Sequence, residues 1–364
     1  MSKKPAASSS PAAVRKELDR LDRELVKLLS DRARTAVKYA QSRQASGGPL
    51  IDLSDETDQL DAALALSKGP LDERALRGVL REVISGCRSL VRPVHIAYLG
   101  PKYSYSHLAA IERFGDSTDL TPAATIKAVF EAVHYGQAEY GLVPIENSTD
   151  GRVVDTLDMF AKLPLTITGE VQLRIHHHLL GKCARSEVTE VYSKPQALSQ
   201  CRDWLAKNVP QAKLIEMTST AVAAQIAADK PGAAAVASRE AGAHYGLASI
   251  DADIEDNKHN VTRFAIIGGQ PPKRSGRDKT ALMIEIPHKP GALADAMAVF
   301  KRARLNLSWI ESFPMSGSKN EYLFFIEFEG HQTDGRVKSA LTSLAKKTAK
   351  MHILGSFPRP QPLD

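Results

Sequence analysis

Three side chains that could handle a proton and an anion lie within four consecutive residues. Asn260, Thr262 and Arg263 supply an amide, a hydroxyl and a guanidinium just before the apolar residues 265–267. An apolar run of this kind predicts a short buried strand, so the polar groups would stand at its mouth. For this stretch alone, a turn whose Asn and Thr bond to their own backbone is the alternative explanation.

Two further apolar runs, 94–99 and 140–145, predict strands that lead into polar strings. Open α/β sheets bind ligands at the carboxyl ends of their strands, so these strings are candidate binding residues. A serine helix cap and an Asx-rich turn would explain the same residues without a ligand. The candidates are Ser104, Ser106, Glu146, Asn147, Ser148 and Thr149.

The region between these strings and the opening motif alternates predicted strands with helices. Strands near 191–193 and 233–238 enclose two helices, and the second of these is alanine-rich and opens at Ser219 and Thr220. The alternation predicts an α/β fold of two lobes with a cleft between them.

Three consecutive histidines, His176, His177 and His178, raise a metal hypothesis. Residues 170–180 alternate like a crossover strand, which would place His176 and His178 on one face and His177 on the other. No acidic or cysteine partner follows at ligand spacing. The sequence therefore predicts no metal site.

Near the N-terminus, apolar residues recur with helical spacing from Val14 to Leu28. No Gly or Pro interrupts the pattern before Gly47, which predicts one helix of more than thirty residues. Two shorter helices, near 54–67 and 72–92, and a second chain would have to cover its apolar stripe.

Arg15, Arg32 and Arg43 fall on or beside this stripe. Burying an unpaired guanidinium is costly, so each arginine needs an anion, and Asp52 and Glu56 are candidates one turn apart. The alternative is that the arginines lie at the edge of the stripe with their charged ends in water.

Composition narrows the class of protein. The net charge of +6 is spread through 364 residues and only 6% of them are aromatic, which disfavours a nucleic-acid partner and favours a small anionic substrate. No stretch approaches the ~20 apolar residues that a membrane span needs. Residues 1–10 lack a hydrophobic signal region and predict a disordered tail. Three scattered cysteines fit a reducing compartment such as the cytoplasm.

The final part of the chain follows a linker at 271–279 that is rich in Pro, Lys, Arg and Gly. Residues 280–354 then alternate in the order strand, helix, strand, strand, helix, strand. This order predicts a ferredoxin-like domain.

The helical segment resembles the chorismate mutase domain that begins bifunctional chorismate mutase/prephenate dehydratases. The matching pattern is Val14-Arg15-x-x-Leu18-x-x-Leu21-Asp22-x-x-Leu25-x-x-Leu28-Leu29-x-x-Arg32. In that family an intertwined dimer surrounds the two carboxylates of chorismate with arginines from both chains. The resemblance implies chorismate-binding roles for Arg15, Arg32, Arg43, Asp52 and Glu56.

Four positions of the helical segment depart from the family pattern. Arg43 stands where the family has a lysine for the ether oxygen of chorismate, and Asp55 reverses the charge of a site arginine. Cys87 and Val91 fall near polar positions of the third helix. A degenerate domain kept for dimerisation is therefore an alternative to an active mutase.

The central segment resembles prephenate dehydratase through five motifs in family order and spacing. They are Gly100-Pro101 with Ser104-Tyr105-Ser106-His107, Pro144-Ile145-Glu146-Asn147-Ser148-Thr149-x-Gly151, Pro195-Gln196-Ala197-Leu198, Ser219-Thr220-Ala221 and Asn260-x-Thr262-Arg263-Phe264. Tyr103 occupies a usual glycine, and Lys194 a usual histidine.

Such enzymes expel the C4 hydroxide and CO2 from prephenate, which requires a proton donor to the leaving hydroxyl and anchors for two carboxylates. The resemblance implies that Thr262 is the donor and that Asn147 and Gln196 bind the substrate as catalytic residues. The remaining substrate-binding residues that it implies are Ser104, Ser106, Glu146, Ser148, Thr149, Lys194, Ser219, Thr220 and Arg263.

The final segment resembles the ACT regulatory module. Pro290-Gly291-Ala292-Leu293 and Glu311-Ser312-x-Pro314 match phenylalanine-binding motifs, although Phe313 replaces the usual arginine of the second motif. A pure dimerisation module is the alternative. The resemblance implies L-phenylalanine binding by Gly291, Ala292, Leu293, Glu311 and Ser312.

These features predict a multidomain α, α/β and α+β protein. Its segments are a tail at 1–10, an all-helical chorismate mutase-like domain at 11–92, a bilobal α/β prephenate dehydratase domain at 93–270, a linker at 271–279 and a ferredoxin-like ACT domain at 280–364. We expect a cytoplasmic homodimer that turns chorismate into prephenate and prephenate into phenylpyruvate. We expect inhibition by L-phenylalanine, and no cofactor, metal, nucleic acid or membrane. The alternatives are a dehydratase with a purely dimerising helical domain and a non-catalytic phenylalanine-sensing regulator.

Overall fold

The computed structural model describes residues 10–48, 51–314 and 322–360, so residues 1–9 of the predicted tail lie outside it. The chain forms two compact units. The first holds Met1–Pro93 and Gly115–Thr118, and the second holds Val94–Phe114 and Asp119–Asp364. No helix within the described ranges is both long and apolar enough to cross a membrane.

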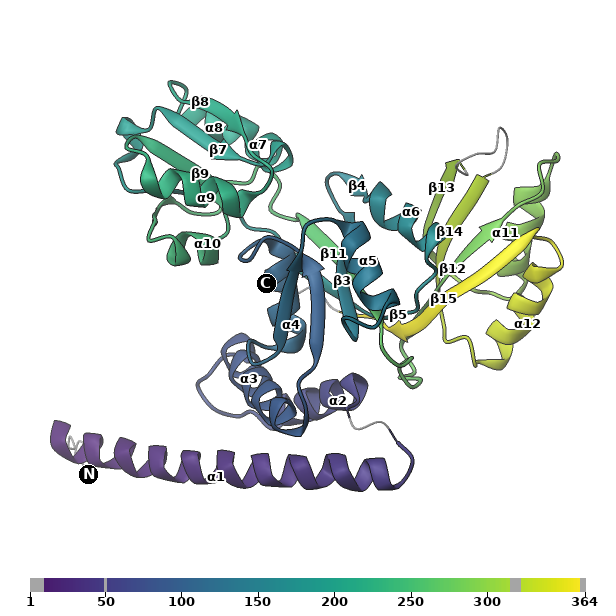
Figure 1. Cartoon of the computed structure of the whole chain (residues 1–364), viewed down its shortest axis with the longest axis horizontal. Helices are drawn as coiled ribbons and strands as arrows, with labels where there is room; N and C mark the ends of the chain where they lie inside the picture. The colour runs from purple at the N-terminus through teal and green to yellow at the C-terminus, as the bar shows by residue number, and fades with distance from the viewer. Residues whose placement is uncertain (1–9, 49–50, 315–321, 361–364) are drawn as a thin grey trace, which may run out of the picture. The chain divides into compact units, whose positions relative to one another are not determined.

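The first unit is helical, and it confirms the single long helix predicted near the N-terminus (Figure 1). Ser10 caps the first helix, which has 35 residues, and Asp52 caps the second by accepting the amides of Ser54 and Asp55. The helices are α1 (Pro11–Ala45), α2 (Leu53–Leu64) and α3 (Glu73–Val91).

The apolar stripe of α1 is exposed within one chain. Leu18, Leu21, Leu25 and Leu28 are 51%, 47%, 53% and 65% exposed, and along the whole described helix only Ala40 is buried. The other two helices of the unit are too short to cover a helix of this length. The stripe is therefore left open.

The second unit begins with a mixed sheet in the order β2-β1-β3-β11-β5, with β4 paired to β3. β11 runs antiparallel to β3, so its first residues lie beside the carboxyl end of β3, and Thr262 pairs with Asn147. The strands are β1 (His95–Leu99), β2 (Asp119–Ala123), β3 (Tyr140–Asn147), β4 (Gly151–Arg152), β5 (Ile167–Arg174) and β11 (Val261–Gly268). The helices next to this sheet are α4 (Tyr105–Phe114), α5 (Ile126–His134) and α6 (Val154–Lys162).

A second sheet follows in the order β10-β6-β9-β7-β8. Its strands are β6 (His178–Gly181), β7 (Glu190–Ser193), β8 (Lys213–Glu216), β9 (Ala233–Ala237) and β10 (Ala248–Asp251). Its helices are the 3-10 turn η1 (Arg185–Glu187), α7 (Pro195–Gln200), α8 (Arg202–Asn208), α9 (Thr220–Asp229) and α10 (Arg239–His244).

The single crossover strand predicted at 170–180 is wrong. The segment forms β5 in the first sheet and β6 in the second, joined by a junction at Ile175–His177. His177 packs inward there and is 2% exposed, so the alternation of buried and exposed residues continues through a break in the strand. That continuity explains why the sequence suggests one strand.

The final sheet has the order β13-β14-β12-β15. α11 and α12 cover one face of it (Figure 1), while Phe313 and Phe325 on the other face pack into a core shared with Phe160. A Cβ atom at Gly355 would lie 2.1 Å from the carbonyl oxygen of Ile167, so only glycine lets β15 approach β5. The elements are β12 (Asp278–Glu285), α11 (Ala292–Arg302), β13 (Leu307–Pro314), β14 (Tyr322–Glu329), α12 (Gly335–Ala345) and β15 (Lys350–Pro358).

Candidate functional site

Asn147 and Thr262 are joined where β3 and β11 meet. The Asn147 Nδ2 donates to Thr262 Oγ1 and to Asn260 Oδ1, both at 2.8 Å. Its Oδ1 accepts the backbone amides of Thr149 at 2.9 Å and Asp150 at 3.0 Å. Because a backbone N–H can only donate, these two bonds fix which way the Asn147 amide faces. Thr262 therefore accepts from Asn147, and its own proton remains available for another acceptor.

Gln200 also belongs to this cluster, although sequence reasoning chose Gln196. The Gln200 Oε1 accepts from Asn260 Nδ2 at 2.9 Å, and its Nε2 donates to Asp150 Oδ2 at 2.9 Å. Gln196 is exposed at the start of α7, one helical turn earlier. Residues four apart share a helix face, so the periodicity of α7 was the signal that made Gln200 an equal candidate.

Several predicted binding residues hold the ends of elements. Ser104 donates to the Leu99 carbonyl at 3.3 Å and accepts the amide of His107 at 3.4 Å, and Ser219 caps α9 by accepting the amide of Val222 at 3.1 Å. These are the bonds expected if the two serines cap helices and bind no ligand. Ser106 and Thr220 are buried in the first turns of α4 and α9, and Lys194 is exposed before α7.

The Ser148 hydroxyl ties the loop after β3 to the start of β11. It donates to the His259 carbonyl at 3.2 Å and accepts the amide of Val261 at 2.9 Å. Thr149 contributes its backbone amide to Asn147 and is itself exposed. Both residues therefore support Asn147 and Thr262 from the loop.

Tyr103, which stands at a position where the sequence resemblance implies glycine, has a φ of 65°. This is the left-handed region that glycine occupies without steric cost. The Tyr103 ring stacks on His244 of α10 with ring centroids 3.9 Å apart. The substitution thus adds a contact between α10 and the loop before α4.

Arg263 lies next to Thr262 but its guanidinium enters a buried cluster of charges. Its Nη1 contacts Glu146 at 2.6 Å, its Nε donates to Glu170 at 3.0 Å, and its Nη2 contacts Glu327 of β14 at 2.7 Å. All three guanidinium nitrogens therefore bind carboxylates. Arg263 and Glu146, both predicted to bind substrate, contact each other in this cluster.

Lys279 of β12 completes this charge cluster by pairing with Glu170 and, at 3.1 Å, with Glu327. Burial by itself would raise the pKa of Glu170, but Arg263 and Lys279 outweigh it and lower that pKa to about 2. Trp309 covers the group, with its ring 5.1 Å from the Arg263 guanidinium carbon. The strand that carries Thr262 is thus tied to the final sheet by ion pairs.

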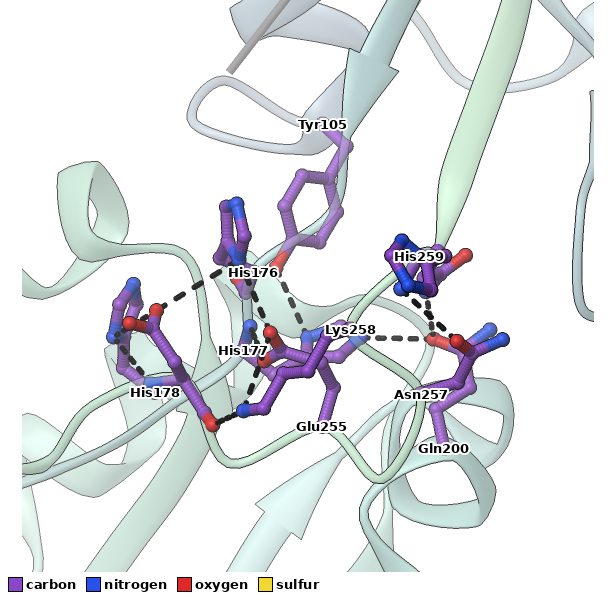
Figure 2. A network of polar contacts seen from close by, with 11 residues as sticks. Tyr105, His176, His177, His178, Gln200, Glu255, Asn257, Lys258 and His259 are labelled. Carbon is purple, nitrogen blue, oxygen red and sulfur yellow. Dashed lines mark hydrogen bonds and ion pairs between the residues drawn. The ribbon is translucent and has the colours of Figure 1, made fainter.

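The junction between β5 and β6 is held by Glu255 (Figure 2). Its carboxylate accepts the backbone amide of His177 at 2.9 Å and contacts His176 Nδ1 at 3.0 Å. Burial would raise the pKa of Glu255, yet these bonds and Lys258 lower it. Burial lowers the pKa of the His177 ring.

His176, Asp253 and Glu255 place ligand atoms within 4.8 Å of one another. The residues around the histidines could not predict this grouping, because Asp253 and Glu255 come from a distant segment of the chain. Lys258 donates to the Asp253 carbonyl and lies 3.7 Å from the Glu255 carboxylate. A lysine thus supplies the positive charge at this group.

In the helical unit the predicted chorismate-binding groups contact protein partners. The Arg43 Nη1 contacts Asp55 at 2.8 Å and Asp52 at 3.9 Å, and the Arg32 Nη1 donates to Cys87 Sγ at 3.2 Å. The residue that reverses the family's charge, Asp55, is therefore the nearest described anion to Arg43.

Glu56 binds Arg88, a residue that sequence reasoning missed. Their side chains are 2.5 Å apart, and the Arg88 side chain is only 4% exposed. Arg15 lies elsewhere, 76% exposed and 3.1 Å from Asp19. Seventeen residues separate it from Arg32, which is about 26 Å along the helix axis at 1.5 Å per residue.

Among the predicted phenylalanine-binding residues, Gly291 has a φ of 81° and precedes α11, Ala292 is buried, and Leu293 is exposed. Glu311 pairs with Arg152 at 2.7 Å, and Ser312 is exposed. A cavity of about 420 Å³ lies beside the second motif, where its lining includes Phe160, Glu285, Phe313, Pro314, Leu323 and His352.

Comparisons with known proteins match both units. The family models for chorismate mutase type II and prephenate dehydratase match residues 14–92 and 96–272. A bifunctional chorismate mutase/prephenate dehydratase of Aquifex aeolicus is 40% identical over 351 residues, which are 95% of this chain and 97% of the relative. The Pseudomonas aeruginosa protein of the same name is 37% identical over 354 residues, 95% of this chain and 97% of the relative. The crystal structure of Arthrobacter aurescens prephenate dehydratase in complex with L-Phe aligns with a TM-score of 0.69 at 32% identity, covering 73% of this chain and 90% of that one.

Proposed function

The chain belongs to the family of bifunctional chorismate mutases/prephenate dehydratases, and we propose how its own residues carry out the two reactions. The enzyme isomerises chorismate to prephenate and converts prephenate to phenylpyruvate, CO2 and water.

Thr262 is the donor to the leaving hydroxyl of prephenate. The observation that carries this role is the pair of backbone amides on Asn147 Oδ1, which turns the Asn147 Nδ2 toward Thr262 and leaves the Thr262 proton for the substrate. As the bond to the departing carboxylate breaks, its electrons aromatise the ring and expel the C4 oxygen. Negative charge grows on that oxygen, where a positioned O–H stabilises it.

Asn147 and Gln200 keep this donor in place, and Gln200 takes the role that the sequence gave to Gln196. The support is that Asn147, Asn260 and Gln200 form one hydrogen-bonded series that ends at Thr262. The exposed Lys194 and the half-buried Ser219 follow β7 and β8, which run parallel and so end at one edge, where they offer anchors for carboxylates.

The test is a comparison of Thr262→Ala with Thr262→Ser, both assayed with prephenate itself. Alanine should lower kcat by about 10²–10⁴-fold, the range of a general acid, while serine keeps the hydroxyl and recovers much of the loss. Conversion of chorismate to prephenate serves as the control for the helical unit, and tryptophan-detected unfolding, which reports Trp204 and Trp309, serves as the control for the second unit. A Thr262→Ala enzyme with the wild-type dehydratase rate would overturn the assignment.

For the mutase we propose a homodimer in which Arg15 of one copy joins Arg32 and Arg43 of the other around chorismate. Two observations support it: the leucine stripe of α1 is exposed in one chain, and Arg15 lies far from Arg32 along the same helix. A second copy packed against α1 would bury the stripe and bring the cations together. The chemistry then consists of holding the folded conformer and stabilising charge on the ether oxygen.

The final segment, 280–364, we propose to be a ferredoxin-like ACT domain that binds L-phenylalanine through Gly291, Ala292, Leu293, Glu311 and Ser312. Its strand order and the L-Phe complex of the Arthrobacter dehydratase support this. The charge cluster of Arg263, Glu327 and Lys279 gives the domain a physical connection to β11. Inhibition would act through the strand that carries Thr262.

The proposed limits remain 11–92 for the mutase domain, 93–270 for the dehydratase domain and 271–279 for the linker, after a tail at 1–10. The family matches at 14–92 and 96–272 support the first two. We place the enzyme in the cytoplasm, where its three cysteines would stay reduced.

A further inference from the structure

Three side-chain amides link Thr262 to a buried histidine in the junction between β5 and β6. We propose that His177 is a positioning residue for the dehydratase: as a neutral ring with its proton on Nε2, it fixes the Gln200 amide and, through Asn260 and Asn147, the direction in which Thr262 donates. This inference rests on the proposed role of Thr262.

The direction of each hydrogen bond follows from the one before it. The Asn147 Nδ2 must donate, so the Asn260 atom that it meets at 2.8 Å is the carbonyl oxygen. The Asn260 nitrogen then faces Gln200, whose facing atom at 2.9 Å must also be an oxygen. An amide oxygen can only accept, so the His177 Nε2, 2.9 Å from the same oxygen, must carry a proton.

The contact with Asp150 independently requires the same orientation of the Gln200 amide. Its second amide atom lies 2.9 Å from the Asp150 carboxylate, which can only accept and therefore requires the nitrogen there. Gln200 is thus oriented by Asp150, by Asn260 and by His177. Reversing its amide would place an oxygen against a carboxylate and a nitrogen against two donors.

The remaining ring nitrogen of His177 faces the hydroxyl of Tyr105 at 3.0 Å, and that hydroxyl also lies 2.7 Å from the His176 carbonyl. The Tyr105 hydroxyl has a single proton, which it donates to the His176 carbonyl. With the His177 proton on Nε2, the Nδ1 of the neutral ring shares that same proton as a second acceptor. The ring is 2% exposed, so its charged form would lose most of its hydration. The Glu255 carboxylate accepts the His177 backbone amide at 2.9 Å, and this bond fixes the backbone position from which the ring reaches Gln200 (Figure 2).

Two isosteric variants separate positioning from packing. In His177→Gln the amide nitrogen can reach the place of Nε2 and still donate to Gln200. In His177→Asn the amide extends only as far as Nδ1, so the contact with Tyr105 survives and the bond to Gln200 is lost. If His177 had a purely structural role, the two variants would have similar dehydratase activity, or His177→Asn, which keeps the Tyr105 contact, would be the more active.

The experiment measures prephenate turnover and chorismate turnover of both variants in the full-length enzyme. We expect His177→Asn to lower the dehydratase kcat by about 10- to 100-fold with a smaller change in KM, because the amide series loses its fixed direction. His177→Gln should recover most of that loss, and both variants should retain mutase activity. A His177→Asn enzyme with the wild-type kcat would overturn the proposal, as would a folded His177→Gln enzyme no better than His177→Asn.

Nitrogen-15 NMR of histidine-labelled enzyme provides a second test that does not depend on activity. The chain has 11 histidines, and the signal missing in His177→Gln identifies the relevant ring. We expect a protonated Nε2 and an unprotonated Nδ1 at neutral pH. A proton on Nδ1 would overturn the inference, even if Thr262→Ala abolished dehydration. Conversely, full activity of Thr262→Ala would overturn the donor role while leaving the tautomer measurement intact.

Discussion

The cluster around Thr262 differs from the arginines of the helical unit. In the cluster, the side chains of one chain already contact one another, whereas the arginines lie apart along one helix. Around Thr262, amides from β3, α7 and the segment before β11 already hold one another at hydrogen-bond distance. In the helical unit, Arg15 pairs with Asp19 near one end of α1, while Arg32 and Arg43 lie toward the other end. A site built from neutral amides can be assembled before its substrate arrives, because these groups satisfy each other.

Cations that must clamp a dicarboxylate cannot satisfy each other in this way. Arg43 therefore pairs with Asp55 and Glu56 with Arg88, and the apolar stripe that should be covered stays exposed. One chain therefore displays the geometry of the proposed dehydratase site. In the homodimer that we propose, by contrast, the charges of the mutase site come together only when two chains and a substrate meet.

The largest expected effect concerns the charge cluster beneath Thr262. Arg263→Met leaves Glu146, Glu170 and Glu327 without their shared guanidinium, and breaking a buried ion pair in this way costs about 3–5 kcal/mol. Urea unfolding followed by tryptophan fluorescence measures it, because Trp204 and Trp309 both lie in the second unit.

The matched control for Arg263→Met is Arg152→Met, which removes a more exposed pair with Glu311. Exposed pairs contribute about 0–1 kcal/mol, so this variant should unfold close to the wild type. Equal destabilisation by the two variants would contradict the idea that the dehydratase region depends on its own buried contacts.

Glu327→Gln should weaken inhibition by L-phenylalanine by about tenfold, a typical coupling between sites. The change removes the charge through which β14 contacts Arg263, while Glu146 and Glu170 still hold the guanidinium. The measurement is the phenylalanine concentration that halves prephenate turnover. Glu329→Gln, which alters an exposed pair with Arg359, is the control, and an inhibition curve unchanged in Glu327→Gln would reject this connection.

Asp55→Ala tests whether the ion pair with Asp55 holds Arg43 away from chorismate. Removing the carboxylate 2.8 Å from Arg43 should let the guanidinium turn to chorismate. We expect the mutase kcat/KM to rise by up to about fivefold, which corresponds to the free energy of about 1 kcal/mol that a partly exposed ion pair contributes. Asp58→Ala, at an exposed position of the same helix, is the control. A loss of mutase activity in Asp55→Ala would mean that the carboxylate holds Arg43 in its working position.

The smallest expected effect is a shift of stability with pH in the second unit. Burial lowers the pKa of His177 below its ordinary 6.5, so the unfolded chain binds the proton more readily and stability falls as pH drops below about 6.5. Glu170, whose pKa is about 2, contributes stability that is lost only as pH falls from about 4.5 toward 2. Tryptophan-detected melting between pH 7 and 5 should therefore slope less in His177→Gln, and an unchanged slope would contradict the buried neutral ring.

Much of the fold could be predicted because periodicity reports local structure. The long helix, the strand at β11 and the alternation of strands and helices all follow from the spacing of apolar residues. The junction at Ile175–His177 could not be predicted in this way, since His177 continues the alternation of β5 although the chain has left the first sheet.

The site was predicted where it depended on neighbours in sequence and missed where it depended on distant contacts. Thr262 and Asn147 stand at strand ends that periodicity identifies, and the register places them side by side. Nothing in the sequence says that Arg263 faces Glu327, or that Glu255 reaches the histidines. Those partners lie 64 and 78 residues away along the chain.

The claim that the mutase site draws residues from two chains and the dehydratase site from one is tested most directly by complementation between inactive subunits of the full-length enzyme. Arg15→Ala and Arg32→Ala should each lose mutase activity, and co-expression should restore about a quarter of it, since half of the dimers are mixed and one of their two sites is intact. Thr262→Ala and Asn147→Ala co-expressed in the same way should recover no dehydratase activity, because both residues act within one chain. Failure of the arginine pair to complement, or recovery of dehydration by the second pair, would contradict the account.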